Sequence, residues 1–215
     1  MKILQPKLSN ELKKNISLSK AIKQAVQESA DDICNLHFAD SLLENLQFKN
    51  LEFSDCCFTN CSLLNSELTK IIFVDVIFEK CDLANTKFLE CSFQRVEFKN
   101  CKLIGADFAD AVLNNTLFAQ CNCKYINLSA TKIKHTIFTE TDLSQGSIQA
   151  SQLSLTNFLQ CNLTEVDLLG TALQDIDLTT SEISGISLAG PELKGALVSV
   201  YQASDLARFL GLVIK

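Results

Sequence analysis

Hydrophobic positions recur at every fifth residue through most of the chain. From Phe38 to Val198 there are 33 such positions, and 28 of them are Phe or Leu. A period of five fits neither an α-helix, with about 3.6 residues per turn, nor a strand, with a repeat of about two. The pattern therefore predicts a chain that turns in the same sense every five residues and points one apolar side chain inward at each step.

A longer period of 20 residues is superimposed on the first. Steps of 20 join Phe38, Phe58, Phe78, Phe98, Phe118, Phe138 and Phe158, and a second series joins Leu43, Leu63, Leu83 and Leu103. A period of five alone does not separate Phe from Leu in this way. Stacked coils of four five-residue sides do, because each side chain packs on its equivalent one coil away. The sequence predicts a solenoid.

Cysteine recurs two residues before the inward Phe and Leu positions. One predicted inward column holds Cys61, Cys81, Cys101, Cys121 and Cys161. Neighbours in a column would lie roughly 4.8 Å apart, which suits the Cα spacing of a disulfide. Parallel side chains rarely reach the dihedral angle that a disulfide needs, and no paired C-x-x-C motif for zinc exists. We predict reduced thiols that fill a narrow interior position.

The two ends of the chain have helical patterns. Apolar residues at Leu18, Ala21, Ile22, Ala25 and Val26 predict a helix within 16–30 that covers the first coil of the solenoid. Ser199 and Gln202 form a capping-box pattern, and Gly211 suits the end of a helix. We predict an N-terminal segment over 1–35, a repeat region over 36–200, and a C-terminal dimerisation helix with a short strand over 201–215.

Local motifs in the repeat region resemble those of the pentapeptide-repeat family. The clearest are Ala106-Asp107-Phe108 and Thr141-Asp142-Leu143, with Val166-Asp167-Leu168 next. The resemblance implies an all-β solenoid, a right-handed quadrilateral β-helix. Residues 36–200 would then make about eight coils, since a coil takes 20 residues.

The ending of the chain resembles that of the Qnr and MfpA-type quinolone-resistance proteins. The match runs through Tyr201-Gln202-Ala203-Ser204, Leu206 and Leu210-Gly211-Leu212. It implies a two-fold homodimer, a rod that imitates B-DNA and binds DNA gyrase. The predicted interface is Tyr201, Leu206, Phe209, Leu210, Leu212, Val213 and Ile214, with Tyr201 and Leu206 packed on the last coil. The unbroken register leaves no room for the projecting loops of Gram-negative Qnr proteins.

Charge is distributed unevenly along the repeats. The formal net charge is −6, yet no Lys or Arg occurs between His135 and Leu193. That stretch carries the predicted partner-binding acids Glu140, Asp142, Glu165, Asp167, Asp175, Asp177, Glu182 and Glu192. Acids on a uniform rod also provide solubility, which is the simpler interpretation. A basic partner that normally holds nucleic acid explains both the acids and the missing bases.

Several function classes are disfavoured. The chain has two histidines, His37 and His135, and no Gly-rich phosphate loop, so we predict no enzyme, no cofactor, no metal and no small-molecule substrate. Net negative charge disfavours direct nucleic-acid binding. No apolar run suits a membrane span or a secretory signal, which predicts a cytoplasmic protein.

Two functions stay open at this point. The first is a DNA mimic that binds DNA gyrase or topoisomerase IV and modulates it or protects it from quinolones. The second is an interaction scaffold or regulator without a topoisomerase target, because fold does not determine function. Outward apolar residues at Ile77, Leu117 and Ile137 either mark a contact surface or are covered by the N-terminal segment.

Overall fold

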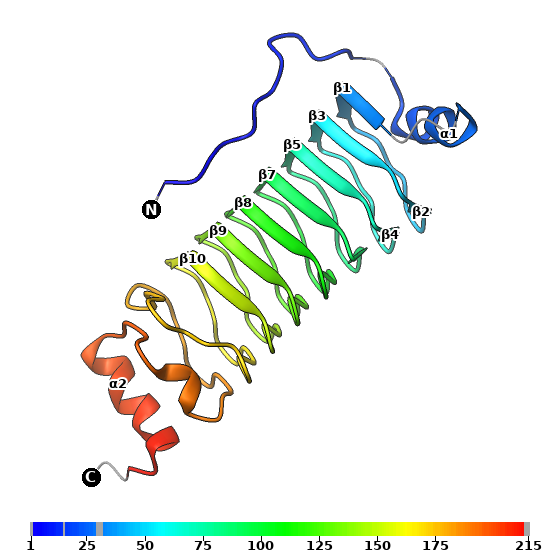
Figure 1. The fold of residues 1–215 in the computed structure, drawn as a ribbon. Coiled ribbons are helices and arrows are strands. Elements are labelled where there is room, and N and C mark those ends of the chain that lie inside the picture. Colours follow the sequence, from blue (N-terminus) through cyan, green and yellow to red (C-terminus); the bar gives the residue numbers. More distant parts are fainter. Residues whose placement is uncertain (1, 15, 29–31, 213–215) are drawn as a thin grey trace.

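Parallel strands stacked one coil apart build a long rod (Figure 1). The computed structural model describes residues 2–14, 16–28 and 32–212. One sheet has seven parallel strands: β1 (Asp32–Ala39), β3 (Glu52–Thr59), β5 (Ile72–Glu79), β7 (Ser92–Lys99), β8 (Val112–Ala119), β9 (Lys132–Thr139) and β10 (Gln152–Leu159). A second side carries β2 (Gln47–Lys49), β4 (Glu67–Thr69) and β6 (Lys87–Leu89).

The register confirms the period of 20. Phe38 pairs with Phe58, and each strand of the large sheet pairs with one that lies 20 residues away, as far as Phe138 and Phe158. Six such steps make a parallel β-solenoid of about six turns. Isolated bridges of the same register continue to Asp177 and Leu197. The right-handed sense and the count of eight coils stay predictions.

Each side of a coil turns at a residue with left-handed backbone. At every fifth position from Asn35 to Gly195, φ is positive for 27 non-glycine residues and five glycines. Asn, Asp and Gly tolerate this conformation best, and β-branched residues tolerate it least. Thr180 is the β-branched residue in this series, and it is also the member without a positive φ. The recurring polar residue is thus selected by backbone geometry.

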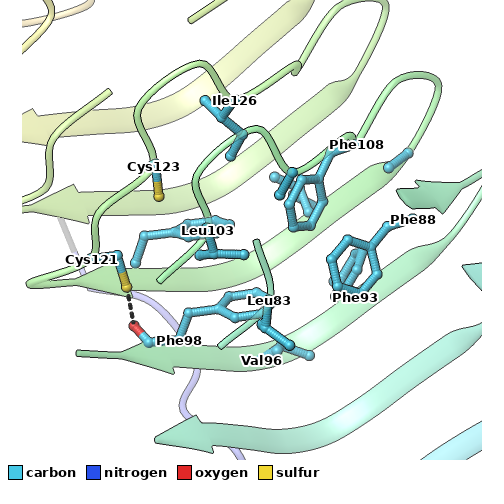
Figure 2. Close-up of a cluster of buried hydrophobic side chains, with 14 of the residues drawn as sticks. Leu83, Phe88, Phe93, Val96, Phe98, Leu103, Phe108, Cys121, Cys123 and Ile126 are labelled. Carbon is cyan, nitrogen blue, oxygen red and sulfur yellow. Dashed lines mark hydrogen bonds between the residues drawn. The ribbon is translucent and has the colours of Figure 1, made fainter. Parts of the chain in front are cut away.

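The interior is filled by columns of equivalent side chains, as predicted. Successive rings from Phe38 to Phe158 have centroids 4.7 to 5.1 Å apart. Phe98 lies next to Leu103 and opposite Phe88 in this packed interior (Figure 2). Identical rings at the strand spacing stack face to face, so that each Phe is buried by its neighbours above and below.

The small inward residues are hydrogen-bond donors as well as fillers. Cys81 Sγ donates to Phe58 O at 3.4 Å and Cys101 Sγ donates to Phe78 O at 3.3 Å, each one coil back. Thr131 Oγ1 does the same toward Phe108 O at 2.8 Å. All ten cysteines are free thiols, and burial raises the pKa of the Cys91 thiol to about 12. Buried Cys, Thr and Ser side chains thus serve the same interior role as small hydrogen-bond donors.

Helices lie at both ends of the rod (Figure 1). Helix α1 (Leu18–Glu28) buries Leu18, Ala21 and Ala25, whereas Val26 stays exposed. At the other end follow η1 (Pro191–Leu193), α2 (Val200–Leu206) and η2 (Ala207–Leu210). The predicted capping box is confirmed, since Ser199 and Gln202 exchange both hydrogen bonds. Within the described residues, no helix has the length and apolarity to cross a membrane.

Candidate functional site

The predicted acids encircle the C-terminal half instead of lining one face. Asp142 and Glu182 lie in one row, two coils apart, because both bridge to Asn162. Asp167 belongs to a second row, between Ser147 and Ser187. Asp177 lies 20 residues after Asn157 of β10, on the side of the rod that carries the large sheet. An approaching basic surface therefore meets carboxylates from several directions.

These acids differ from the earlier ones in their partners. Glu140 accepts a hydrogen bond from Gln120 at 3.0 Å, and Glu165 accepts one from Gln145 at 2.8 Å, both neutral donors one coil back. Between residues 67 and 102, by contrast, Lys70–Glu90, Glu67–Lys87, Asp75–Arg95, Asp82–Lys102 and Glu97–Lys99 form ion pairs. Across the described residues, no ion pair involves an acid after Glu97. The negative charge of residues 140–182 is uncompensated.

Local hydrogen bonds keep two of these carboxylates ionised. Thr179 donates both its backbone N–H and its hydroxyl to Asp177, and these bonds hold the pKa of Asp177 below its usual value. Ser184 does the same for Glu182 and lowers the pKa of that carboxyl. Both groups carry full charge at neutral pH and remain exposed to solvent.

Glu192 has a different place in the fold. It is 9% exposed, and its carboxylate accepts backbone N–H bonds from Gly170, Ala189 and Gly190 at 2.9 to 3.1 Å. The carboxylate caps the turn that enters η1 and is occupied within the chain. The exposed acidic surface is therefore made by the other seven residues, Glu140, Asp142, Glu165, Asp167, Asp175, Asp177 and Glu182.

The C-terminal end presents apolar side chains to solvent. The prediction that Leu206 packs on the last coil is confirmed, while the prediction for Tyr201 is wrong, because Tyr201 is 88% exposed. Gln202 instead anchors α2 by donating to Leu178 O and Ser181 O, both at 2.8 Å, which turns Tyr201 outward. Phe209 is half-buried and Leu212 is exposed. The Leu210 side chain, Val213, Ile214 and the predicted strand beyond Leu212 lie outside the described residues.

An apolar cavity of about 510 Å³ opens beside this end. It is lined by Leu193, Ala196, Val198, Leu206 and Leu212, among others. Val200 is 86% exposed at the first position of α2. Together with Tyr201, these residues form an apolar end surface next to the acidic coils, which is the place where a second copy was predicted.

The large sheet carries the N-terminal segment on its outer face. Residues 2–14, here called the N-terminal strap, lie extended along its outer face (Figure 1). Leu4 N–H donates to Asn115 at 3.0 Å, Lys7 N–H to Asp75 at 2.8 Å, and Ser9 N–H to Asp55 at 2.7 Å. Lys13 pairs with Leu36 of β1. The outward residues Ile77, Leu117 and Ile137 of the same sheet are half-buried, and their cover by the N-terminal segment stays a prediction.

The strap contacts share one structural signal. Asp55, Asp75 and Asn115 all occupy the left-handed position of their strands, in β3, β5 and β8. Asn and Asp at every fifth residue were visible in the sequence, but their role as acceptors along one line depends on which side of the coil faces the strap. The apolar residues Ile3, Pro6 and Leu8, spaced by three and two residues, are half-buried in the structure. Their spacing was the other sign in the sequence that this segment lies on a surface.

Family models for pentapeptide repeats match most of the solenoid. The model described as "Pentapeptide repeat region" matches residues 51–128 and 91–154, and the model described as "Pentapeptide repeats (8 copies)" matches residues 147–179. Together they span 51–179, or 129 of the 215 residues. No curated protein matches the chain.

Solved structures with the same repeat fold are similar at low identity. Trypsin-treated QnrB1, a plasmid-mediated fluoroquinolone resistance protein, is 20% identical with a TM-score of 0.44, over 86% of this chain and 95% of QnrB1. HetL, involved in heterocyst differentiation regulation in the cyanobacterium Nostoc sp. strain PCC 7120, is 15% identical with a TM-score of 0.33, over 85% of this chain and 95% of HetL. At these identities the likeness concerns the fold alone. The period of five, the 20-residue register and the matched models together place this chain in the pentapeptide-repeat family.

Proposed function

We propose that this protein is a cytoplasmic DNA mimic that binds a type II topoisomerase, DNA gyrase or topoisomerase IV, and modulates it or protects it from quinolones. The observation that carries the proposal is the uncompensated charge of residues 140–182, where every described hydrogen bond to an acid comes from a neutral group. A cationic DNA-binding groove would supply the missing counter-charges.

A homodimer would place two acidic halves next to each other. The apolar end surface of Val200, Tyr201 and Leu212 is suited to burial against a second copy. Eight right-handed coils with a rise of about 4.8 Å would then give a dimeric rod of roughly 80 Å. B-DNA has one charge per roughly 1.7 Å of its axis, so the imitation is partial and the acids nearest the two-fold axis matter most.

Two features bear on the choice of partner. The ending from Tyr201 to Ile214 resembles that of Qnr proteins, and this resemblance suggests gyrase as the partner. The exposed acids suggest only that the partner's binding site is basic. The filled interior supports a binding role without catalysis or cofactor. A regulator with another basic partner is the competing function, and the enzyme assay below separates the two.

Purified gyrase tests the proposal directly. Binding should be measured with and without duplex DNA, which we expect to compete, and supercoiling should be measured with and without a quinolone. Changing Asp167, Asp175 and Asp177 to Asn and Glu182 to Gln keeps the local acceptors and should weaken binding and flatten its dependence on salt. The matched control changes Asp40 and Asp110 to Asn and Glu44 and Glu52 to Gln, four acids that form no ion pair among the described residues.

The expected result is loss of binding in the first variant alone. Equal loss in both variants would reduce the effect to net charge. Supercoiling that is unaffected by a large excess of the protein, without protection from a quinolone, would leave the regulator as the function.

Assembly is tested on the full chain. Val200→Asp and Tyr201→Asp place acids in the first turn of α2, which suits the helix dipole and leaves the monomer fold intact. Light scattering should show a dimer for the natural chain and a monomer for the double variant. A natural chain that is monomeric at micromolar concentration contradicts the dimer.

A further inference from the structure

The outer face of the large sheet holds the N-terminal strap almost entirely through side-chain acceptors. Three backbone N–H groups of the strap, those of Leu4, Lys7 and Ser9, are bound by Asn115, Asp75 and Asp55. Among the described residues of the strap, backbone pairing is confined to Lys13, whose N–H donates to Asn35 O and whose O accepts the N–H of His37. The strap can therefore leave without opening any coil of the solenoid.

The acceptors form a line that is selective for an extended chain and tolerant of its sequence. Asp55, Asp75 and Asn115 lie at the same position of their coils, and a chain that crosses the strands meets them in turn. Each accepts a backbone N–H, which every residue except proline offers. Among the side chains of the strap, Ser9 adds one hydroxyl bond to Asp55. Another extended peptide could make the same three bonds.

Charge and burial define the kind of peptide. The strap carries Lys2, Lys7, Lys13 and Lys14 against a single acid, Glu11, and lies over the carboxylates of Asp55 and Asp75. The side chains of Ile3, Pro6 and Leu8 are half-buried. The outward column beside the line of acceptors contains Ile77, Leu117 and Ile137, and it also contains Glu97, which is only 4% exposed.

Arg95 holds the acceptor at the centre of the line in place. Its guanidinium binds Asp75 in a fork, with Nε to Oδ1 at 2.6 Å and Nη2 to Oδ2 at 2.7 Å. The fork fixes the Asp75 carboxylate while Oδ1 also accepts the N–H of Lys7. An acceptor held in place before binding loses little side-chain freedom when a peptide arrives.

From these contacts we infer that the sheet face over β3, β5, β7 and β8 is a binding site for an extended basic segment of a partner protein, with the N-terminal strap as its built-in competitor. The partner segment has backbone N–H groups free, apolar residues at intervals of two or three, and flanking Lys or Arg. A tethered competitor acts at an effective concentration in the millimolar range, so the free site is seen only when the strap is displaced.

Proline substitutions in the strap test this site on the full chain. Leu4→Pro, Lys7→Pro and Ser9→Pro remove the three donors and leave the solenoid unchanged. The probe is a synthetic, fluorescein-labelled peptide of residues 2–14, followed by fluorescence anisotropy. We expect the triple-proline chain to bind the probe with a Kd about tenfold or more below that of the natural chain, because its own strap no longer competes.

Two controls make the result specific. Adding Asp55→Ala to the triple-proline chain should weaken probe binding about tenfold, because two bonds to Ser9 are lost, and Ala is tolerated at left-handed positions such as Ala130 and Ala150. A probe with Glu in place of each Lys should bind weakly to every chain. A triple-proline chain that binds the probe no better than the natural chain overturns the proposal.

Strap exchange between copies is distinguished by mass. If the natural chain forms dimers that the triple-proline substitution abolishes, the occupant is a second copy and the partner-segment proposal is wrong. This outcome is independent of gyrase binding, because the strap lies at the opposite half from the acids of residues 140–182.

Discussion

In residues 67–102, five acidic side chains form ion pairs, four of them with a basic side chain one coil away, whereas residues 135–193 contain acids but no Lys or Arg. Both halves have the same 20-residue register. The inter-coil pair Asp82–Lys102, at 3.0 Å, has its counterpart in Gln145 beside Glu165, at 2.8 Å, where the cation is replaced by an amide. The backbone does not require this difference, which points to selection on the surface of the second half.

The interiors of the two halves also differ. Phe rings stack continuously from Phe38 to Phe158, and the repeats beyond Phe158 contain no Phe. In the described structure, no backbone hydrogen bond joins β10 to residues 172–179, and a groove of about 380 Å³ lies there beside Leu155 and Ala172. The stacked rings therefore continue into the second half as far as Phe158, and only the last coils combine looser stacking with exposed charge.

The largest effect is expected in the Phe column. The Phe98 ring lies 5.0 Å from that of Phe78 and 4.7 Å from that of Phe118, so Phe98→Ala leaves a cavity between two rings. We expect a loss of about 3–5 kcal/mol in the free energy of unfolding. Leu178→Ala, in the second half, should cost less, since no Phe stacks on its outer side. Urea unfolding measures both, and equal small losses would contradict the inward assignment.

The stability of the second half should depend on pH through the ionisation of Glu192. Backbone N–H groups, with that of Gly170 foremost, hold the pKa of the Glu192 carboxyl below its usual value. Its contribution to stability is present above the unfolded pKa and is lost as the pH falls through the lower folded pKa. Glu192→Gln should cost about 1–3 kcal/mol at neutral pH and should reduce the loss of stability that occurs as the pH falls below the usual pKa of a Glu carboxyl. The exposed Glu165→Gln is the control, and a similar loss there would contradict this role.

Backbone conformation gives the next effect. Asn100 has φ of 52°, and Asn100→Val puts a β-branched residue in the left-handed region at a cost of about 1–2 kcal/mol. Asn100→Gly is the matched control, because glycines such as Gly105 and Gly170 occupy the same position of their coils with a positive φ. Thermal unfolding should show a lower midpoint for the first variant alone. If both variants unfold at the natural temperature, backbone strain does not select Asn, Asp and Gly here.

The sequence predicted the solenoid well because one short period controls it. Every inward Phe from Phe38 to Phe158 was identifiable, since a column of identical residues at steps of 20 leaves no other register. Both capping helices followed from local signals at Leu18 and Ser199. The left-handed positions are equally periodic, but Asn and Asp at surface positions are also expected from solubility alone, so the sequence does not identify their backbone role.

The site was less predictable, since it depends on which groups meet in space. Glu192 and Glu182 both lie one residue before an inward position, so the sequence alone does not distinguish them. In the structure the turn at Pro191 directs the Glu192 carboxylate to three backbone N–H groups. From the sequence, the aromatic Tyr201 is expected to pack on the last coil. In the structure Gln202 contacts that coil instead, because its amide donates to Leu178 O and Ser181 O. The strap makes long-range contacts, such as Leu4 with Asn115, that no local pattern encodes.

The smallest change in stability is expected where the comparison of halves is most direct. Gln120→Lys and Gln145→Lys would place cations beside Glu140 and Glu165, and Asn162→Lys would place one between Asp142 and Glu182. Lys70 and Lys80 show that Lys is tolerated at the left-handed position of Gln120 and Gln145.

The control, Asn65→Lys, Asn85→Lys and Asn100→Lys, adds the same charge to the first half. Both variants should change the free energy of unfolding by less than about 1 kcal/mol, because exposed ion pairs contribute little. Binding to gyrase should nevertheless weaken roughly tenfold in the first variant and far less in the control, since only the first neutralises a field that attracts a cationic groove. If the acids of the second half served solubility alone, the two variants would bind gyrase equally, and both would differ from the natural chain only in their tendency to precipitate.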